Sequence, residues 1–221
     1  MTDWRPSAPF GALRRRARLL AGIRAFFAAR DVLEIEAPVL GLAGVTDVHI
    51  DNLVVAGEPL GYLQSSPEYF LKRLLAVHSA PIYYLGKAFR AGEQGRFHNP
   101  EFTLLEWYRP DWDDRGLMDE VEALLRDLGA AGAAPCPRLE YRTCFRDALG
   151  VDPHSADDIR LRRLAAEAAG QPELSWRHEP RAICLDLLFS LRVEPRLPAG
   201  VVFVTDYPVC QAALARVVDT P

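Results

Sequence analysis

The chain has 221 residues, of which 49% are hydrophobic and 25% are charged. These proportions are globular and exclude a disordered or collagen-like chain. The formal net charge of −4 argues against bulk binding of polyanions. Because no uncharged apolar run reaches the ~20 residues that span a bilayer, and because residues 1–9 carry no apolar signal segment, we expect no membrane partner and a cytoplasmic location.

Cysteine and histidine positions give no sign of a metal site. The four cysteines stand at positions 136, 144, 184 and 210, a spacing that matches no zinc pattern. The five histidines form no ligand cluster. We therefore expect free, buried thiols and assign no metal ligand within the chain.

The first third of the chain predicts a helix, an extended segment and a hairpin. Residues 10–30 have helical periodicity, with apolar side chains at 13, 17, 20, 23 and 27. Arginines cover much of the rest of this helix, either as a solvated face or as a docking surface for an anionic partner. Residues 32–40 alternate like a strand, in which Pro38 suits an edge or an end. Residues 48–64 predict a hairpin around the turn at 57–61.

Further along the chain, helices dominate. A helix is predicted from 65 to 77, where Ser65 and Glu68 fit a capping box, and another from 117 to 128. Residues 130–137 read as a linker, and 138–195 as mostly helical, with Ser155 and Asp158 capping one helix. A buried strand is expected at 201–204.

Two strands, at 82–91 and 100–109, carry the most informative pattern. Because side chains alternate along a strand, one face is expected to pack on the core through Leu85, Phe89, Leu105 and Trp107. The opposite face then carries small residues, an arginine, a carboxylate and two aromatics: Gly86, Ala88, Arg90, Phe102, Leu104, Glu106 and Tyr108. Small residues leave room for a ligand to lie flat. The six residues from Phe102 to Tyr108 extend roughly 20 Å, which suits a nucleotide joined to a small acid.

This hairpin resembles motif 2 of the class II aminoacyl-tRNA synthetases, in the lysyl, aspartyl and asparaginyl branch. The likeness lies in Phe89-Arg90 and in residues 98–106, His-Asn-Pro-Glu-Phe-Thr-Leu-Leu-Glu. Residues 32–40 resemble motif 1, which builds a homodimer interface in that family. The run Ser66-Pro67-Glu68-Tyr69 is similar to the lysyl enzymes, and Glu106-Trp107-Tyr108-Arg109-Pro110 is closer to a paralogous branch, the elongation factor P–lysine ligases. The likeness extends from about Leu13 to Ala215.

The resemblance implies an α+β fold, a class II aminoacyl-tRNA synthetase-like catalytic domain with a mainly antiparallel sheet flanked by helices. We expect residues 1–221 to form one partial domain, with an N-terminal tail at 1–8 and a helical insertion at 138–200. The glycine-rich motif 3 of the family, with its arginine, does not occur in the chain. We therefore expect the domain to be incomplete at its C-terminus, and these residues alone to show weak or no ligase activity.

The implied activity is an ATP-dependent ligation. Lysine or (R)-β-lysine would be activated as an adenylate and transferred to a lysine of elongation factor P. ATP and Mg²⁺ are the implied cofactors, with the Mg²⁺ ligands expected beyond Pro221, and a homodimer is the implied assembly. Two alternatives stay open: a stand-alone lysyl-tRNA synthetase-like domain that charges tRNA, and a truncated non-catalytic binding or dimerisation module.

The resemblance also assigns site residues. Arg90 matches the motif 2 arginine and is the expected catalytic residue, because a guanidinium binds phosphate and carboxylate oxygens together. Phe102 matches the adenine-stacking position and Asn99 an ATP contact. Glu93 stands one place later than the family's glutamate, so the loop either reaches ATP through Glu93 or loses that contact. The expected substrate-binding residues are Ser66, Glu68, Glu106 and Tyr108.

Each of these residues also has a purely structural explanation. Arg90 would pair with Glu101 or Glu106 across the hairpin. Residues 65–68 would serve only as a helix cap, and the two aromatics would belong to the core. Glu106 is harder to explain in this way, because a carboxylate is rarely buried unpaired.

Overall fold

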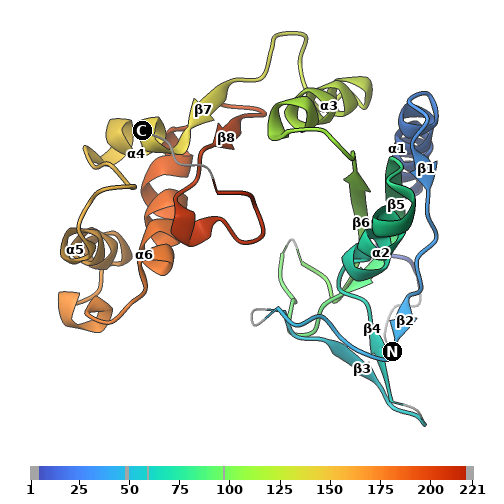
Figure 1. The fold of residues 1–221 in the computed structure, drawn as a ribbon, viewed down its shortest axis with the longest axis horizontal. Coiled ribbons are helices and arrows are strands. Elements are labelled where there is room, and N and C mark those ends of the chain that lie inside the picture. The colour runs from blue at the N-terminus through green and yellow to red at the C-terminus, as the bar shows by residue number, and fades with distance from the viewer. Residues whose placement is uncertain (1–4, 48–49, 59, 97, 218–221) are drawn as a thin grey trace. The chain divides into compact units, whose positions relative to one another are not determined.

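A long antiparallel hairpin organises the first part of the chain in the computed structural model, which describes residues 5–47, 50–58, 60–96 and 98–217 (Figure 1). β5 (Ile82–Phe89) and β6 (Glu101–Tyr108) pair along their full length, from Ile82 opposite Tyr108 to Phe89 opposite Glu101. β1 (Leu33–Glu34) pairs with β5 in parallel. The two predicted strands are confirmed; β5 ends before the polar loop that joins them, and β6 begins after it.

One face of this hairpin packs on α1 (Phe10–Ala28) and α3 (Asp114–Asp127). The ring of Phe27, which is fully buried, stacks on Tyr83 with centroids 4.6 Å apart. The predicted core residues Leu85, Leu105 and Trp107 pack against the same cluster. The alternation of side chains along the strands therefore identifies the core face correctly, although Phe89 is half-buried outside that cluster.

The apolar stripe of α1 is buried only in its second half. Ile23, Phe26 and Phe27 are buried, whereas Leu13 and Ala17 are exposed. The helix is present as predicted, but the apolar side chains Leu13 and Ala17 of its first half stay exposed, and Arg16 contacts the hairpin there by donating to Thr103 Oγ1 at 2.6 Å.

The opposite face of the hairpin is covered at one end by α2 (Glu68–His78), where Leu71 packs with Ile82 and Tyr84. Tyr84 also folds over its own strand, because a Cβ built on Gly86 would lie 2.5 Å from the Tyr84 hydroxyl oxygen. The expectation of open space above Gly86 is therefore wrong. A phenol ring fills it, since alternation brings Tyr84 to the same face as Gly86.

A second small sheet lies beside this hairpin in the chain's first unit. β2 (Leu40–Gly41), β4 (Gly61–Leu63) and β3 (Leu53–Val55) form it in that order, and all its pairs are antiparallel. The β3–β4 pairing confirms the predicted hairpin, of which residues 48, 49 and 59 lie outside the described residues. Pro38 lies in the extended connection between β1 and β2.

Residues 131–221 form a second compact unit, separate from residues 1–130. Its elements are β7 (Arg138–Glu140), α4 (Tyr141–Leu149), α5 (Asp158–Ala169), α6 (Arg181–Leu188), β8 (Phe203–Thr205), a π-helical turn (Phe189–Val193) and three 3₁₀ turns (Glu173–Trp176, Glu194–Arg196 and Val209–Gln211). The helices surround their own core, which includes Tyr141, Phe145, Leu161 and Leu185. β7 and β8 pair in parallel. All four cysteines lie in this unit; Cys136, Cys144 and Cys184 are buried as expected, whereas Cys210 is exposed rather than buried.

The predicted helical character of 138–195 is confirmed, and the strand predicted at 201–204 is shifted to 203–205 and only half-buried. The assignment of 138–200 as an insertion, and of 1–8 as a tail, stays a prediction; residues 1–4 of that tail lie outside the described residues. Helices together with mixed and antiparallel pairing agree with an α+β class. The described strands form three small sheets, however, instead of one.

Both predicted capping residues are wrong. Ser65 Oγ is buried without a hydrogen-bond partner among the described residues, and Ser66 Oγ accepts from the Glu68 amide at 3.1 Å. The reason is that α2 begins at Glu68, after Pro67, which brings Ser66 rather than Ser65 to the free N–H. Similarly, Asp157 caps α5 in place of Ser155, accepting from the Arg160 amide at 2.8 Å.

We expect Gly86→Ala to destabilise the first unit, because the new methyl group would overlap the ring of Tyr84. Overpacking of this kind costs about 1–3 kcal/mol, measurable as a lower urea midpoint. Gly95→Ala is the matched control, since a Cβ there meets no atom within 4 Å. Equal midpoints for the two variants would contradict the close packing of Tyr84 on Gly86.

Candidate active site

The predicted acyl-binding residues come together where α2 begins beside β6. Ser66 Oγ donates to Glu106 Oε2 at 2.6 Å, and the Tyr108 hydroxyl donates to Glu106 Oε1 at 2.6 Å. Both carboxylate oxygens of the half-buried Glu106 are thus held by hydroxyl groups. No Lys, Arg or His of the described residues pairs with Glu106, so its negative charge is oriented but not neutralised.

Tyr108 and Glu68 are the neighbours that shape the surroundings of Glu106. Burial, the hydrogen bond to Glu106, and the charges of Glu106 and Glu68 all raise the pKa of Tyr108, so its hydroxyl stays protonated as a donor. Glu68 Oε1 lies 2.6 Å from Lys72 Nζ, one turn along α2, and this pair is half-exposed. A cationic ligand placed here would compensate an oriented, partly desolvated carboxylate.

A second group of predicted residues surrounds Arg90, at the loop end of the hairpin. The Arg90 guanidinium lies over the Phe102 ring, 5.1 Å from its centroid, and Nη1 is 3.6 Å from Glu93 Oε1. Arg90 Nε is buried without a hydrogen-bond partner among the described residues. The predicted pairs with Glu101 and Glu106 do not form, because Glu101 pairs with Lys87 and Glu106 accepts from hydroxyls. Arg90 therefore keeps donors for an anion.

The hairpin register separates the two groups along one face. Phe102 and Glu106 are four residues apart on β6, roughly 14 Å at ~3.4 Å per residue. Asn99 is exposed in the loop, and its side chain joins neither group. The predicted site residues thus gather in two groups, one around the arginine Arg90 and one around the carboxylate Glu106, and their binding roles stay a prediction. Sequence reasoning missed Gln64 and Tyr84, which are hydrogen-bonded to each other and to the Lys87 carbonyl of β5.

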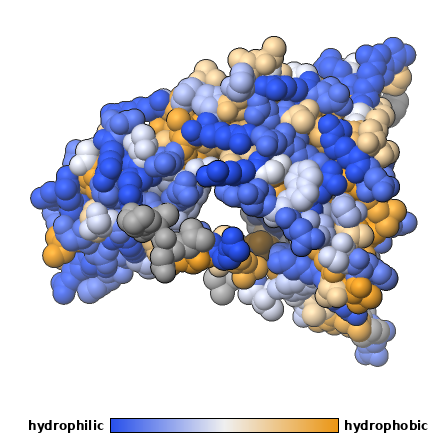
Figure 2. Space-filling model, turned by 45° about the horizontal axis from the view of Figure 1, so that its top comes forward, coloured by the Kyte–Doolittle hydropathy of each residue, from blue (hydrophilic) through white to orange (hydrophobic). Residues whose placement is uncertain are grey.

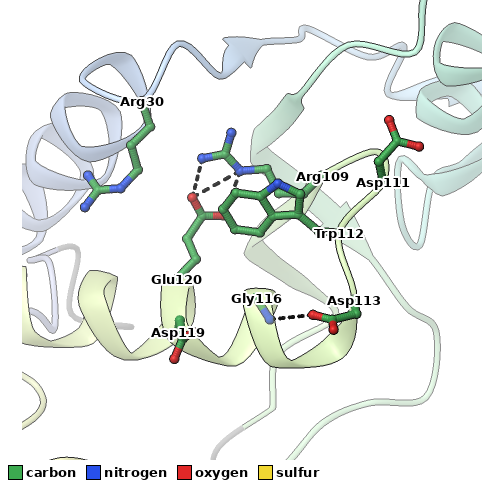
Figure 3. Close-up of a pocket in the computed structure, with 8 residues that line it drawn as sticks. All are labelled: Arg30, Arg109, Asp111, Trp112, Asp113, Gly116, Asp119 and Glu120. Carbon is green, nitrogen blue, oxygen red and sulfur yellow. Dashed lines mark hydrogen bonds and ion pairs between the residues drawn. The ribbon is translucent and has the colours of Figure 1, made fainter.

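A separate open pocket of about 810 Å³ lies around the first turns of α3, and none of the predicted site residues lines it (Figure 3). Arg109 and Glu120 point toward one another there, and both side chains are buried. Arg109 Nε donates to Glu120 Oε2 at 2.9 Å, and Trp107 Nε1 donates to the same oxygen at 3.0 Å. The Arg109 guanidinium also lies over the ring of Trp112 at 4.7 Å.

This pocket shows how residues 106–110 divide their roles by alternation. Glu106 and Tyr108 lie on the face of the predicted acyl-binding residues, whereas Trp107 and Arg109 converge on Glu120 of α3. The pocket is therefore lined by a structural ion pair. No pattern in the sequence indicated that Glu120 is the partner of Arg109.

The family of the chain follows from comparison with known proteins. The sequence model of the family described as tRNA synthetases class II (D, K and N) matches residues 2–220. The chain belongs to this family.

Relatives within this class II family point to one branch. A protein of Vibrio cholerae named elongation factor P–(R)-β-lysine ligase is 44% identical over 227 residues, covering 98% of this chain and 68% of its own. Proteins with the same name from Erwinia tasmaniensis and Pseudoalteromonas translucida are 46% and 44% identical, each with 68% of its own length covered. The class II family uses ATP to activate an acid, so the chain is an enzyme of the ligase type, in agreement with the likeness found in residues 106–110.

Two absences concern only the part of the chain that the structure describes. No helix there has the length and apolar character needed to cross a membrane. Nor do three His, Cys, Asp or Glu side chains gather there as a metal site would require.

We expect Glu120→Gln to destabilise the first unit strongly, because it leaves the buried guanidinium of Arg109 without its counter-charge. Removing one partner of a buried pair costs about 3–5 kcal/mol. Glu101→Gln, which breaks the half-exposed pair with Lys87, is the control and should cost about 1 kcal/mol or less. Denaturant titration of both variants measures the difference; equal losses would refute a structural role for the Arg109–Glu120 pair.

Proposed function

We propose that the chain is the ligase portion of an enzyme that activates lysine or (R)-β-lysine with ATP and transfers it to a lysine of elongation factor P. The relatives of that name align with 97–98% of the chain. The observation that carries the substrate class is Glu106, whose two oxygens are aligned by Ser66 and Tyr108 without a cation.

A substrate ammonium group fits this end of the site. Glu106 supplies the negative charge, because Glu68 is already paired with Lys72, and the hydroxyls of Ser66 and Tyr108 satisfy one lone pair on each Glu106 oxygen. The remaining lone pairs point to a donor with several N–H groups, which an ammonium provides. A lysine-type acid would therefore be held here by its cationic end, with its carboxylate directed along the hairpin.

A nucleotide fits the other end. Phe102 offers a ring for stacking on adenine, and Arg90, with a buried and unpaired Nε, offers a guanidinium fork for phosphate oxygens. Glu93, 3.6 Å from Arg90, orients that guanidinium and takes the place of the expected direct contact with ATP. Asn99 is proposed as an ATP contact from the exposed loop.

In the proposed reaction, a substrate carboxylate oxygen attacks the α-phosphate of ATP and pyrophosphate leaves. The amine of the acceptor lysine then attacks the acyl carbonyl, and AMP leaves. Arg90 stabilises charge that develops on the phosphate, and the acyl-binding residues keep the carboxylate in line. Mg²⁺ would neutralise the polyphosphate, but the described residues offer no metal cluster, so we assign it no ligand in this chain. The cytoplasm, where translation factors are made, is the proposed compartment.

We expect Glu106→Gln to weaken binding of (R)-β-lysine at least tenfold, about 1.4 kcal/mol, because the ammonium loses its anionic partner. Isothermal titration of the chain measures this without requiring turnover. Glu101→Gln, a carboxylate on the core-side face of the same strand, is the control and should bind as the unaltered chain does. Unchanged affinity in Glu106→Gln would refute the assignment of the acyl site.

The acceptor is tested by offering elongation factor P and tRNA together, with ATP and labelled (R)-β-lysine. We expect slow, ATP-dependent labelling of elongation factor P alone, abolished by Arg90→Ala because transition-state stabilisation is lost. Labelled tRNA would favour the lysyl-tRNA synthetase-like alternative. Binding without any labelling, unaffected by Arg90→Ala, would favour the non-catalytic alternative.

A homodimer is proposed through the exposed half of α1 and the segment that follows it. Phe10, Leu13, Leu33 and Leu42 are 46–78% exposed there, and exposed apolar side chains that gather on a surface mark interaction sites. Figure 2 shows hydrophobic groups set among hydrophilic ones over the surface it presents. Pairing of two copies would cover these side chains.

We expect light scattering after size exclusion to give twice the chain mass of 24.6 kDa. Leu13→Asp should shift the population to monomer by placing a charge in the interface. Leu174→Asp, at a leucine of the second unit that is more exposed than Leu13, is the control that should leave the mass unchanged. A monomeric chain at all concentrations would refute the dimer.

A further inference from the structure

Gln64 ties the two ends of the candidate site together. It directly precedes Ser65 and Ser66 in the chain and is 8% exposed. Its backbone N–H donates to the Val39 carbonyl at 2.9 Å, and its backbone carbonyl accepts from the Phe89 backbone N–H at 2.8 Å. The backbone of Gln64 thus joins the segment that leads to the acyl-binding residues to the residue just before Arg90.

The Gln64 side chain adds a closed triangle of hydrogen bonds. Its Nε2 donates to the Tyr84 hydroxyl at 2.9 Å and to the Lys87 carbonyl at 3.2 Å. The Tyr84 hydroxyl donates to the same carbonyl at 2.8 Å. Both N–H groups of the Gln64 side-chain amide are used as donors, and both lone pairs of the Lys87 backbone carbonyl accept. Burial raises the pKa of Tyr84, so the hydroxyl remains a donor.

The side-chain carbonyl of Gln64 is held in a position that is unfavourable for folding. Gln64 Oε1 is buried without a partner among the described residues, and an unpaired buried acceptor disfavours folding. The amide is nevertheless held with its nitrogen toward Tyr84 and Lys87. Residues that keep such a local cost are concentrated at functional sites.

We propose that Gln64 and Tyr84 are positioning residues that set the distance between the acyl-binding Ser66 and the phosphate-binding Arg90. The inference rests on the proposed function, because it concerns how the acid and the α-phosphate are brought into line. An attack needs its two atoms about 3–3.5 Å apart, so a shift of one segment against the other would slow the reaction. Neither Gln64 nor Tyr84 needs to touch the substrate for this role.

Tyr83 provides a matched control on the same strand. It is 3% exposed and Tyr84 is 4% exposed, and each hydroxyl is hydrogen-bonded. Tyr83 faces the opposite side, however, where it donates to Glu34 at 2.8 Å. Replacing either tyrosine with phenylalanine removes a buried hydroxyl from β5, but only Tyr84→Phe opens the triangle.

The first test is pyrophosphate exchange with ATP and (R)-β-lysine. We expect Tyr84→Phe to lower kcat about tenfold while both KM values stay within about twofold, the pattern of lost alignment rather than lost binding. Tyr83→Phe should keep kcat within about twofold. Equal kcat values for the two variants would overturn the proposal, because the triangle would then be ordinary packing.

The second test does not depend on turnover. In amide hydrogen exchange, we expect Tyr84→Phe to speed exchange several-fold in residues 64–68 and 87–91 together, and Tyr83→Phe to affect only 33–35 and 82–84. If Tyr84→Phe speeds exchange in only one of these two segments, the proposed link between them is refuted. If the unaltered chain shows no pyrophosphate exchange, the proposed function of these residues fails. Amide hydrogen exchange still decides whether the triangle of hydrogen bonds joins the two segments.

A double-mutant cycle completes the design. Gln64→Met keeps the volume but removes the amide donors, so it should lower kcat in the same direction as Tyr84→Phe. Since both changes break one shared hydrogen bond, their combined effect on kcat should be smaller than the product of the two. Independent effects that multiply fully would show that Gln64 and Tyr84 do not act together.

Discussion

The antiparallel register of β5 and β6 is the constraint on which the candidate site depends. It places Glu106 opposite Tyr84 and Phe102 opposite Ala88, so the residues proposed to bind a cation and an anion share one face. A slip of one residue would turn every side chain of one strand to the other face. The buried stack of Phe27 on Tyr83 opposes such a slip, because it would move Tyr83 out of the core.

The same alternation explains why one short segment serves two purposes. Along residues 106–109, alternate side chains form the proposed acyl-binding end and the support on α3. The ion pair of Arg109 with Glu120 holds α3 against the end of β6, behind the face that carries Glu106. Neighbouring residues therefore carry the proposed substrate contacts and the contacts that hold the strand in place.

Charge compensation gives the site its chemical character. The Arg109–Glu120 pair is buried and complete, whereas Glu106 and Arg90 lie where a ligand could supply the missing counter-charge. Glu106 is held by hydroxyls, which orient a carboxylate without neutralising it. Arg90 is stacked on Phe102 and only loosely paired with Glu93. The charges of Arg90 and Glu106 have opposite signs and lie apart on one face of the hairpin. They suit an adenylate of a cationic amino acid, which carries both a phosphate and an ammonium group, better than they suit a nucleotide or an amino acid by itself.

The sequence by itself determined the two strands of the hairpin, most of the helices and the face of the hairpin that meets the core. It also carried the likeness to the synthetase family, because the matching residues of motif 2 lie in one continuous stretch of the chain. Only the tertiary structure decided that Tyr84 covers Gly86, that Gln64 reaches Lys87, and that Trp107 and Arg109 meet on Glu120. The contact of Tyr84 with Gly86 depends on side-chain direction within one strand, and the others join residues that are distant in the chain and depend on tertiary packing. Local periodicity holds no information on which distant group will fill a given space.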